Sequence, residues 1–241
     1  LLSLTLLSFL FFVRILRADK PRKTHLICYL LANILLSYTH IYGLFTIGSQ
    51  VLYFFLFRRK YARARLAFWG AQAATLVSFS PWIFVLVTNT FRGAISGLDW
   101  LSTPSLWDIL DTLSKYVGSG LLGPLLVLSF LFFCLAGVLY IPRTRGKRGL
   151  AKPLQSSKQM SLGILIAEPK TALLLVWFFF PLVISLFLSF TVRPIFWEKY
   201  LIGIIPALYL LAARGIETIS FFVETYVMRL ALPGAHQGLP Y

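Results

Sequence analysis

The side chains best suited to chemistry gather in one short segment near the end of the sequence. Arg193-Pro-Ile-Phe-Trp-Glu-Lys199-Tyr200 combines charged and aromatic residues between two long apolar segments. Arginine and lysine bind phosphate through charge-assisted hydrogen bonds. Arg193 and Lys199 are therefore candidate ligands for a phosphate group. The alternative is a pairing of Arg193 or Lys199 with Glu198, with the long side chains extending along an apolar surface.

A second polar cluster interrupts an otherwise uncharged stretch. Tyr38, His40 and Tyr42 follow one another at every second position. Their ring and hydroxyl groups could meet a phosphate or the hydroxyl groups of a sugar. Trp100, in a later polar loop, is a further candidate for the same face. The alternative interpretation is an aromatic belt of the kind that flanks apolar segments, with one exposed histidine.

Acidic residues and metal ligands are sparse. Asp108 and Asp111 stand three residues apart, but they share the polar face of a predicted amphipathic helix, which favours a solvated surface. Neither these two residues nor Asp99 is assigned as catalytic. The histidines and cysteines lack metal-ligand spacing, and nucleotide-binding and hydrolase motifs are absent. No metal site and no cofactor is evident, and a requirement for a divalent metal stays open.

The composition shows what must position these side chains. Of 241 residues, 58% are hydrophobic and 13% charged, against about 25% charged residues in an ordinary soluble domain. The net charge of +15 alone would suggest a nucleic-acid binder. The basic residues, however, separate long apolar segments instead of coating a polar surface. The sequence therefore predicts an all-α integral membrane protein that binds no nucleic acid.

Two basic clusters decide the topology of the first third. They lie at 14–23 and 58–65 and should share the cytoplasmic side. Leu26–Phe57 between them holds no charged residue. A single helix of that length would measure about 48 Å, against a hydrocarbon core of about 30 Å. Two short spans are predicted instead, with a turn near 38–43.

Seven spans satisfy hydropathy and charge together. Only four of the 23 Lys and Arg residues fall outside the predicted cytoplasmic segments, namely Arg92, Lys115, Arg193 and Lys199. The external loop 88–118 is predicted to hold an amphipathic interfacial helix, with Thr103 as its N-cap and Trp107 as an anchor. We expect a polytopic transmembrane helix bundle over 1–222 and a tail over 223–241. The predicted spans are Leu1–Leu16, two within Leu26–Phe57, Leu66–Val87, Ser119–Tyr140, Thr171–Phe190 and a last one from Leu201.

The order of these features resembles a known family. A Tyr-Thr-His-Ile-Tyr turn at 38–42 is followed by Pro81-Trp82, an external loop with Trp and Pro, and Pro194-Ile-Phe-Trp-Glu-Lys-Tyr-Leu201, which leads to Gly215. Over Leu1–Gly215 the chain looks like the membrane portion of bacterial polytopic glycosyltransferases of the C-type superfamily. These are the relatives of protein O-mannosyltransferases and lipid A sugar transferases.

The resemblance implies transfer of a sugar from a polyprenyl-phosphate-linked donor to an acceptor on the outer side of the bacterial inner membrane. The chain would be multi-pass with cytoplasmic basic loops, and its partners would be the lipid-linked donor and membrane lipids. Lys199 and Tyr200 match the family's basic–Tyr pair, in which arginine is the more frequent cation. The resemblance therefore implies that Lys199 and Tyr200 contact the lipid phosphate of the donor. Tyr38 and His40 match the hairpin turn.

The resemblance also implies that the loop with the catalytic base is missing from this chain. Family members carry a carboxylate general base in the first external loop, which would precede Leu1. No residue of this chain matches that base, so the catalytic residue is unknown. The expectation is an N-terminally truncated fragment that is inactive alone.

Two other functions compete with sugar transfer. The first is a lipid flippase or transporter subunit, although no charged residue lies near a predicted midplane. The second is a structural membrane subunit without catalysis. The sequence does not specify the sugar, the acceptor, the length of the lipid carrier or the oligomeric state.

Overall fold

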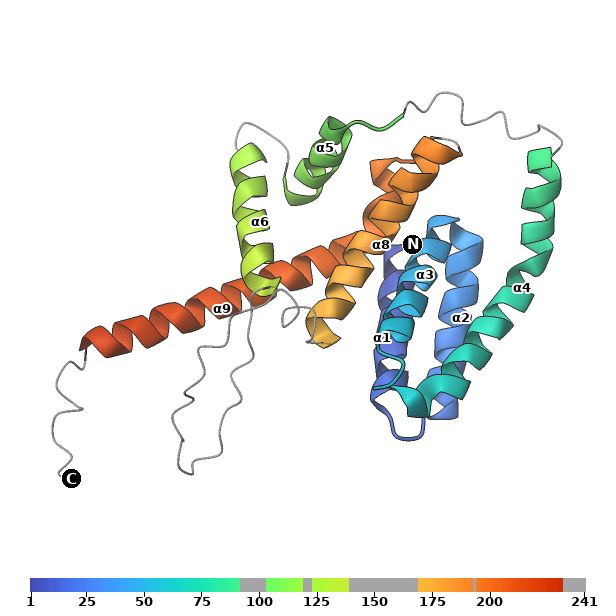
Figure 1. Cartoon of the computed structure of the whole chain (residues 1–241), viewed down its shortest axis with the longest axis horizontal. Coiled ribbons are helices and arrows are strands. Elements are labelled where there is room, and N and C mark those ends of the chain that lie inside the picture. Colours follow the sequence, from blue (N-terminus) through green and yellow to red (C-terminus); the bar gives the residue numbers. More distant parts are fainter. Residues whose placement is uncertain (92–102, 119–122, 139–168, 193, 232–241) are drawn as a thin grey trace.

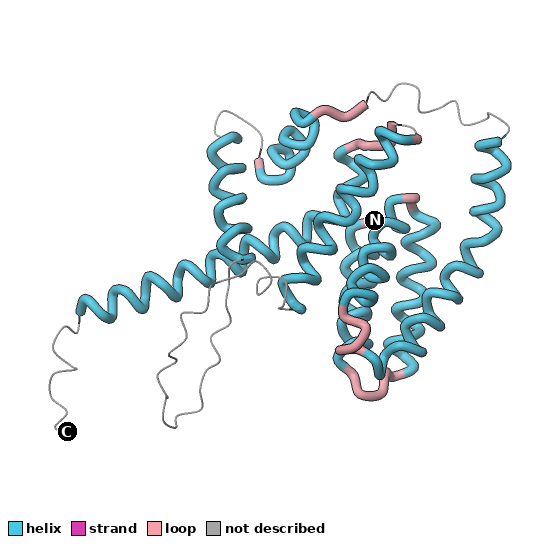
Figure 2. Tube along the Cα trace, in the orientation of Figure 1, coloured by secondary structure: helices cyan, strands magenta, loops and turns pink. Residues whose placement is uncertain are grey.

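The protein is helical in a computed structural model that describes residues 1–91, 103–118, 123–138, 169–192 and 194–231. Within these ranges the chain forms helices and connecting loops, and no strand is present (Figure 2). The predicted all-α class is therefore confirmed. The helices are α1 (Leu2–Arg17), α2 (Lys23–Thr39), α3 (Tyr42–Leu56), η1 (Ala62–Ala64), α4 (Arg65–Phe91), α5 (Leu106–Val117), α6 (Gly123–Val138), α8 (Pro169–Thr191), η2 (Glu198–Ile204) and α9 (Ile205–Ala231).

Each segment predicted as a span contains a helix: α1, α2, α3, α4, α6, α8 and α9. Among the described residues, three stretches are long and apolar enough to cross a membrane, namely Ala62–Asn89, Pro169–Thr191 and Lys199–Ser220. Large apolar side chains also remain on the surface. Leu66, Val77 and Phe84 along α4 are 84%, 71% and 70% exposed. Such surface is typical of a protein whose solvent is partly lipid.

The uncharged stretch at 26–57 folds as a helical hairpin. α2 ends at Thr39, and α3 begins at Tyr42, with His40 in an extended conformation between them. The predicted turn is therefore confirmed. α2 and α3, of 17 and 15 residues, are about 26 and 23 Å long. A Cβ atom at Gly43 would collide with the Leu36 carbonyl group, so glycine allows the two helices to approach at the turn.

The two basic clusters lie at the same end of the bundle. The loop between α1 and α2 and the segment after α3 both lie at the lower end in Figure 1. An ion pair between Arg63 and Asp19 joins them. The α2–α3 turn lies at the opposite, upper end. The predicted placement of both basic loops on one side thus holds for the bundle itself.

A buried network of uncharged polar side chains ties the first four long helices together. Ser8 of α1 donates to the Asn33 side chain of α2 at 2.6 Å, and Gln50 of α3 donates to Ser8 at 2.7 Å. Tyr29 donates to Gln50 at 2.6 Å and accepts a hydrogen bond from Gln72 of α4 at 2.7 Å. Polar contacts of this kind hold helices together where the surroundings are apolar, because hydrophobic contrast between helices is lost in lipid.

Trp177 of α8 connects α1 and η2 to each other. The Phe9 and Trp177 rings stack with centroids 3.6 Å apart, joining α1 to α8. Trp177 also donates its ring N–H to the Gly203 carbonyl oxygen at 3.0 Å. A Cβ atom at Gly203 would meet the hydroxyls of Thr5 and Thr46 at ordinary contact distance. The segment that carries Lys199 and Tyr200 is therefore packed against α1, α3 and α8.

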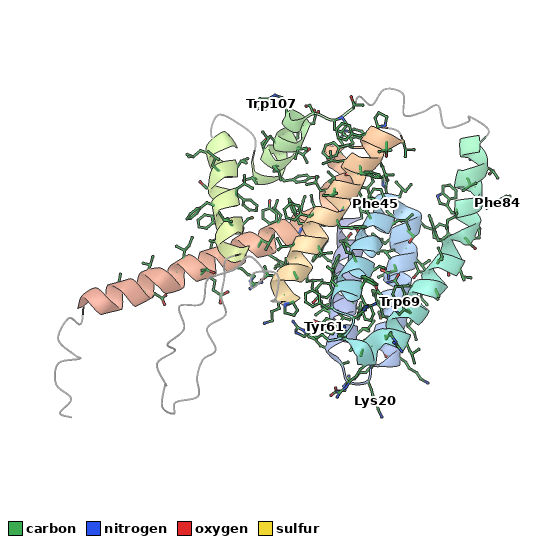
Figure 3. The ribbon with its side chains drawn as sticks, viewed as in Figure 1. Lys20, Phe45, Tyr61, Trp69, Phe84 and Trp107 are labelled. Carbon is green, nitrogen blue, oxygen red and sulfur yellow. The ribbon has the colours of Figure 1, made fainter. Side chains whose placement is uncertain are left out.

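The predicted amphipathic helix is present, but it begins later than expected. Ser105, and not Thr103, is the N-cap of α5. The side chain of Asp108 accepts the Ser105 N–H at 2.6 Å, while Ser105 accepts the Asp108 N–H. This reciprocal capping box satisfies two helix-end donors, which a cap at Thr103 would not do. Trp107, labelled in Figure 3, is 77% exposed.

The C-terminal helix is longer than predicted. α9 runs without a break to Ala231 and so passes the expected boundary between the membrane domain and the tail at 222. Arg214 of α9 donates to the Thr171 hydroxyl of α8 at 2.9 Å. The region 232–241 lies outside the described residues. Figure 1 shows α9 crossing the lower end of α6 and extending away from the bundle.

Candidate functional site

Aromatic rings from two distant parts of the chain meet above the helical hairpin. The His40 ring lies on the Tyr200 ring, with centroids 4.1 Å apart and planes inclined by 35°. Tyr42 lies 5.5 Å from both rings, measured between centroids. Trp197 contacts Tyr200 edge-on at 5.0 Å. We call His40, Tyr42, Trp197 and Tyr200 the aromatic cluster.

Lys199 places a positive charge at the edge of the aromatic cluster. Its Nζ atom lies 4.8 Å from the centroid of the Trp197 ring, a cation–π distance. The Lys199 side chain is exposed, while Tyr200 is half-buried. A cation on an exposed rim above partly buried aromatic rings can bind an anion whose remaining part is apolar or sugar-like.

Hydrogen bonds hold the segment before η2 in place. Tyr42 donates its hydroxyl to the Ile195 carbonyl oxygen at 2.7 Å. Ser189, at the end of α8, accepts the backbone N–H groups of Ile195 and Phe196 at 3.0 and 2.9 Å. Phe196 is buried beneath them. Side chains of α3 and α8 therefore position the residues that follow, including Lys199.

The protonation of His40 follows from its surroundings. The Tyr42 backbone N–H donates to the Nδ1 atom of His40 at 3.2 Å, so the proton of the neutral ring lies on Nε2. Burial lowers the pKa of His40 below its ordinary 6.5. At neutral pH, His40 is an uncharged donor through Nε2.

The structure brings together four of the seven predicted site residues: His40, Tyr42, Lys199 and Tyr200. Tyr38 is not among them. Its hydroxyl donates to the Ser78 carbonyl oxygen at 2.7 Å, and its ring packs edge-on against Phe79. Tyr38 thus faces α4. It still belongs to α2, whereas His40 lies beyond the end of that helix and has an extended backbone. Arg193 and Trp100 lie outside the described residues.

Two contributors to the site were missed from the sequence. Trp197 contacts both Lys199 and Tyr200, although the sequence showed it only as one aromatic residue among several. Ser189 lies in a continuous apolar helix, and nothing in its neighbours indicates that it accepts two backbone N–H groups. A serine at the last turn of an apolar helix, just before an irregular segment, is the only local signal.

Asp108 and Asp111 stabilise α5 and belong to no candidate site. Asp108 closes the capping box of α5, and hydrogen bonds from Ser105 lower the pKa of Asp108. Asp111 forms an ion pair with Lys115 at 2.7 Å. Both carboxylates are exposed on the polar face predicted for them. No group of three or more potential metal ligands occurs in the part of the chain that the structure describes.

A scan against protein families and searches of curated proteins and of solved structures find no match to this chain.

Proposed function

We propose that the chain is the membrane part of a glycosyltransferase that moves a sugar from a polyprenyl-phosphate-linked donor to an acceptor on the extracytoplasmic side. The observation that carries the proposal is the aromatic cluster with Lys199 at its edge. Two motifs, which the sequence separates by about 160 residues, form a single surface there. In this proposal Lys199 contacts the lipid phosphate.

The chemistry of the cluster suits a phosphodiester or pyrophosphate with apolar and sugar substituents. Lys199 supplies a mobile point charge, and the Tyr200 hydroxyl and the His40 Nε2–H are neutral donors beside it. The aromatic rings offer flat apolar faces for an isoprenoid or for the C–H face of a sugar. When the glycosidic bond breaks, negative charge grows on the leaving phosphate, and the Lys199 cation and the neutral donors stabilise it.

The proposed setting is the bacterial inner membrane, with seven spans and cytoplasmic basic loops. Three helices of sufficient length and apolarity, and the exposed apolar side chains of α4, support the membrane setting. The joining of the two basic loops at one end supports the orientation, because Lys- and Arg-rich loops are retained on the cytoplasmic side. The aromatic cluster would then lie on the outer side, together with α5.

Binding of the donor lipid tests the role of Lys199. The probe is a polyprenyl phosphate, titrated into the purified protein in detergent and followed by tryptophan fluorescence. Lys199→Ala should weaken binding at least tenfold, or by about 1.4 kcal/mol or more. The matched control is Lys115→Ala, which removes a lysine paired with Asp111 on α5 and should leave binding within twofold of wild type.

The reaction itself is tested in the natural full-length protein with a labelled sugar on the same carrier. Transfer should occur, and Lys199→Ala should lower it in parallel with donor binding. Unchanged binding and transfer in Lys199→Ala would support a structural membrane subunit instead. Movement of labelled lipid across a vesicle membrane without sugar transfer would support the flippase.

A further inference from the structure

A cavity lies at the opposite end of the bundle from the aromatic cluster. Its volume is about 470 Å³, and it opens between the C-terminal end of α1, the segment after α3 and the first turn of α8. Tyr61, which lines it, is labelled near the lower ends of these helices in Figure 3.

Three cations from three separate elements line the cavity: Arg17 of α1, Lys60 before η1 and Lys170 of α8. Among the residues that the structure describes, no acidic side chain lines it. The ion pairs of the described residues, Arg63–Asp19 and Lys115–Asp111, involve none of these cations. Three like charges around one space repel one another, and an anion between them would remove that repulsion.

Two tyrosine hydroxyls complete the polar part of the cavity. The hydroxyls of Tyr53 and Tyr61 lie 3.1 Å apart, and Tyr53 donates to the Pro169 carbonyl oxygen at 3.0 Å. Since the Tyr53 proton is used on Pro169, Tyr61 is the donor between the two hydroxyls in this state, and it can turn toward a bound anion. These bonds join α3 to the start of α8 and keep the two sides of the cavity together.

The remaining wall of the cavity is apolar. Val13 of α1 and Leu173 of α8 lie about one helical turn further into the bundle than Arg17 and Lys170. Leu16 directly precedes Arg17 and adds to the same wall. A polar anion-binding end that continues into an apolar wall matches the shape of a lipid, with its phosphate at the cations and the start of an acyl chain along the helices.

We propose that this cavity binds the phosphate group of an anionic membrane lipid. The proposal rests on the membrane setting proposed above, but not on sugar transfer. Basic loops attract anionic lipids without a defined site, at about 1 kcal/mol per Lys or Arg. A defined site differs from that attraction because it depends on the cations that line the cavity and not on the neighbouring ones.

Two double variants distinguish a defined site from diffuse attraction. Each of them removes two positive charges. Arg17→Gln with Lys170→Gln removes two cations that line the cavity. Lys20→Gln with Arg22→Gln removes two cations of the adjacent loop, which do not line it. Each protein is placed in nanodiscs of equal parts phosphatidylglycerol and phosphatidylcholine, and the lipids retained after release into detergent are quantified by native mass spectrometry.

The wild-type protein should retain phosphatidylglycerol at least fivefold over phosphatidylcholine. The cavity variant should lose that preference, whereas the loop variant should keep it within twofold. Equal losses in the two variants, or no preference in the wild type, would overturn the proposal. Because the substituted side chains are exposed, both variants should elute as the wild type does. If the cavity variant does not, Lys60→Gln alone provides the same test, with at least a twofold loss of preference expected.

A free phosphate is the other possible source of the same chemistry. Inorganic phosphate at 10 mM should leave the retained phosphatidylglycerol unchanged within twofold, because it gains nothing from the apolar wall. Displacement of the lipid by phosphate at that concentration would overturn the lipid assignment. Polyprenyl phosphate binding at Lys199 should be unaffected in the cavity variant, so the two proposals fail independently.

Discussion

At the scale of single residues, position along the turn decides which side chain can act. Tyr38, His40 and Tyr42 look alike in the sequence, yet only His40 and Tyr42 meet Tyr200. Tyr38 is still on α2 and donates to Ser78 of α4. His40 has left the helix, and its extended backbone directs the ring to the other side. Tyr38 and His40 are thus only two positions apart, yet the first packs against α4 and the second belongs to the candidate site.

The pH dependence of stability tests the environment of His40. In the unfolded chain this imidazole titrates near 6.5, whereas burial lowers its pKa in the folded protein. As the pH falls below 6.5, the unfolded chain binds a proton that the folded protein does not, so the free energy of unfolding should decrease. His40→Gln should flatten this dependence between pH 7.5 and 5.5, measured by denaturation in mixed detergent micelles.

Glutamine is the appropriate replacement because its carbonyl oxygen can accept the Tyr42 N–H in place of Nδ1. An equally steep pH dependence in wild type and variant would show that another group is responsible.

At the scale of elements, small residues decide how closely helices approach. Gly215 of α9 lies against the Phe133 backbone of α6, and a Cβ atom there would collide with the Phe133 carbonyl group. The Tyr209 hydroxyl donates to the Tyr116 carbonyl oxygen at 2.6 Å, so α5 is fastened to the same helix. Close crossings at glycine are a common means of packing helices in lipid. α5, α6 and α9 therefore form one unit.

Replacement of two glycines tests this crossing. Gly215→Ala should lower the free energy of unfolding by about 2 kcal/mol, because the backbones must separate. Gly70→Ala is the matched control, since a Cβ atom at Gly70 of α4 meets nothing within 4 Å. That change should be neutral or stabilise by up to about 1 kcal/mol through helix propensity. Equal effects in a denaturation series in detergent would contradict the close crossing.

At the scale of the whole molecule, charge and aromatic groups are separated along the bundle. The basic loops and the cavity with Arg17, Lys60 and Lys170 lie at one end, and the aromatic cluster lies at the other. The proposed donor site and the proposed lipid site therefore lie at opposite ends of the helical bundle. In the two proposals anionic groups bind at both ends, but with different neighbours: partly buried aromatic rings at one end and an apolar cavity wall at the other.

Cysteine labelling tests the proposed orientation. After replacement of Cys28 and Cys134, single cysteines are introduced by Lys20→Cys in the α1–α2 loop and by Trp107→Cys on α5. A membrane-impermeant maleimide should label the Trp107→Cys protein in intact cells. It should label the Lys20→Cys protein at least tenfold less until the membrane is permeabilised. Equal labelling of both, or the reverse order, would be incompatible with the proposed topology.

Several features of the fold could be predicted because they depend on local sequence. The α2–α3 turn follows from an uncharged segment that is too long for one span and holds its polar residues in the middle. The α5 helix follows from its apolar spacing, although its cap was placed two residues early. Capping depends on one side-chain rotamer, so Ser105 and Thr103 could not be distinguished beforehand.

Other features could not be predicted because they depend on the rotation of each helix about its axis. Apolar helices have little contrast between their faces, so their sequence does not reveal which side contacts protein. The network of Ser8, Asn33, Gln50 and Tyr29 illustrates this, since each residue appears in the sequence as an isolated polar interruption. The contact between the His40 and Tyr200 rings depends on the same helix rotations.

The sequence by itself determined the helical class, the positions of the apolar segments and the common end of the two basic loops. Hydropathy, charge and turn chemistry act over a few residues, so they can be read along the chain. The tertiary structure alone decided that Lys199 lies beside the aromatic cluster, that Tyr38 does not, and that Arg17, Lys60 and Lys170 surround one cavity. These outcomes depend on packing between helices far apart in sequence, where side-chain shape and backbone approach select one arrangement among many of similar hydropathy.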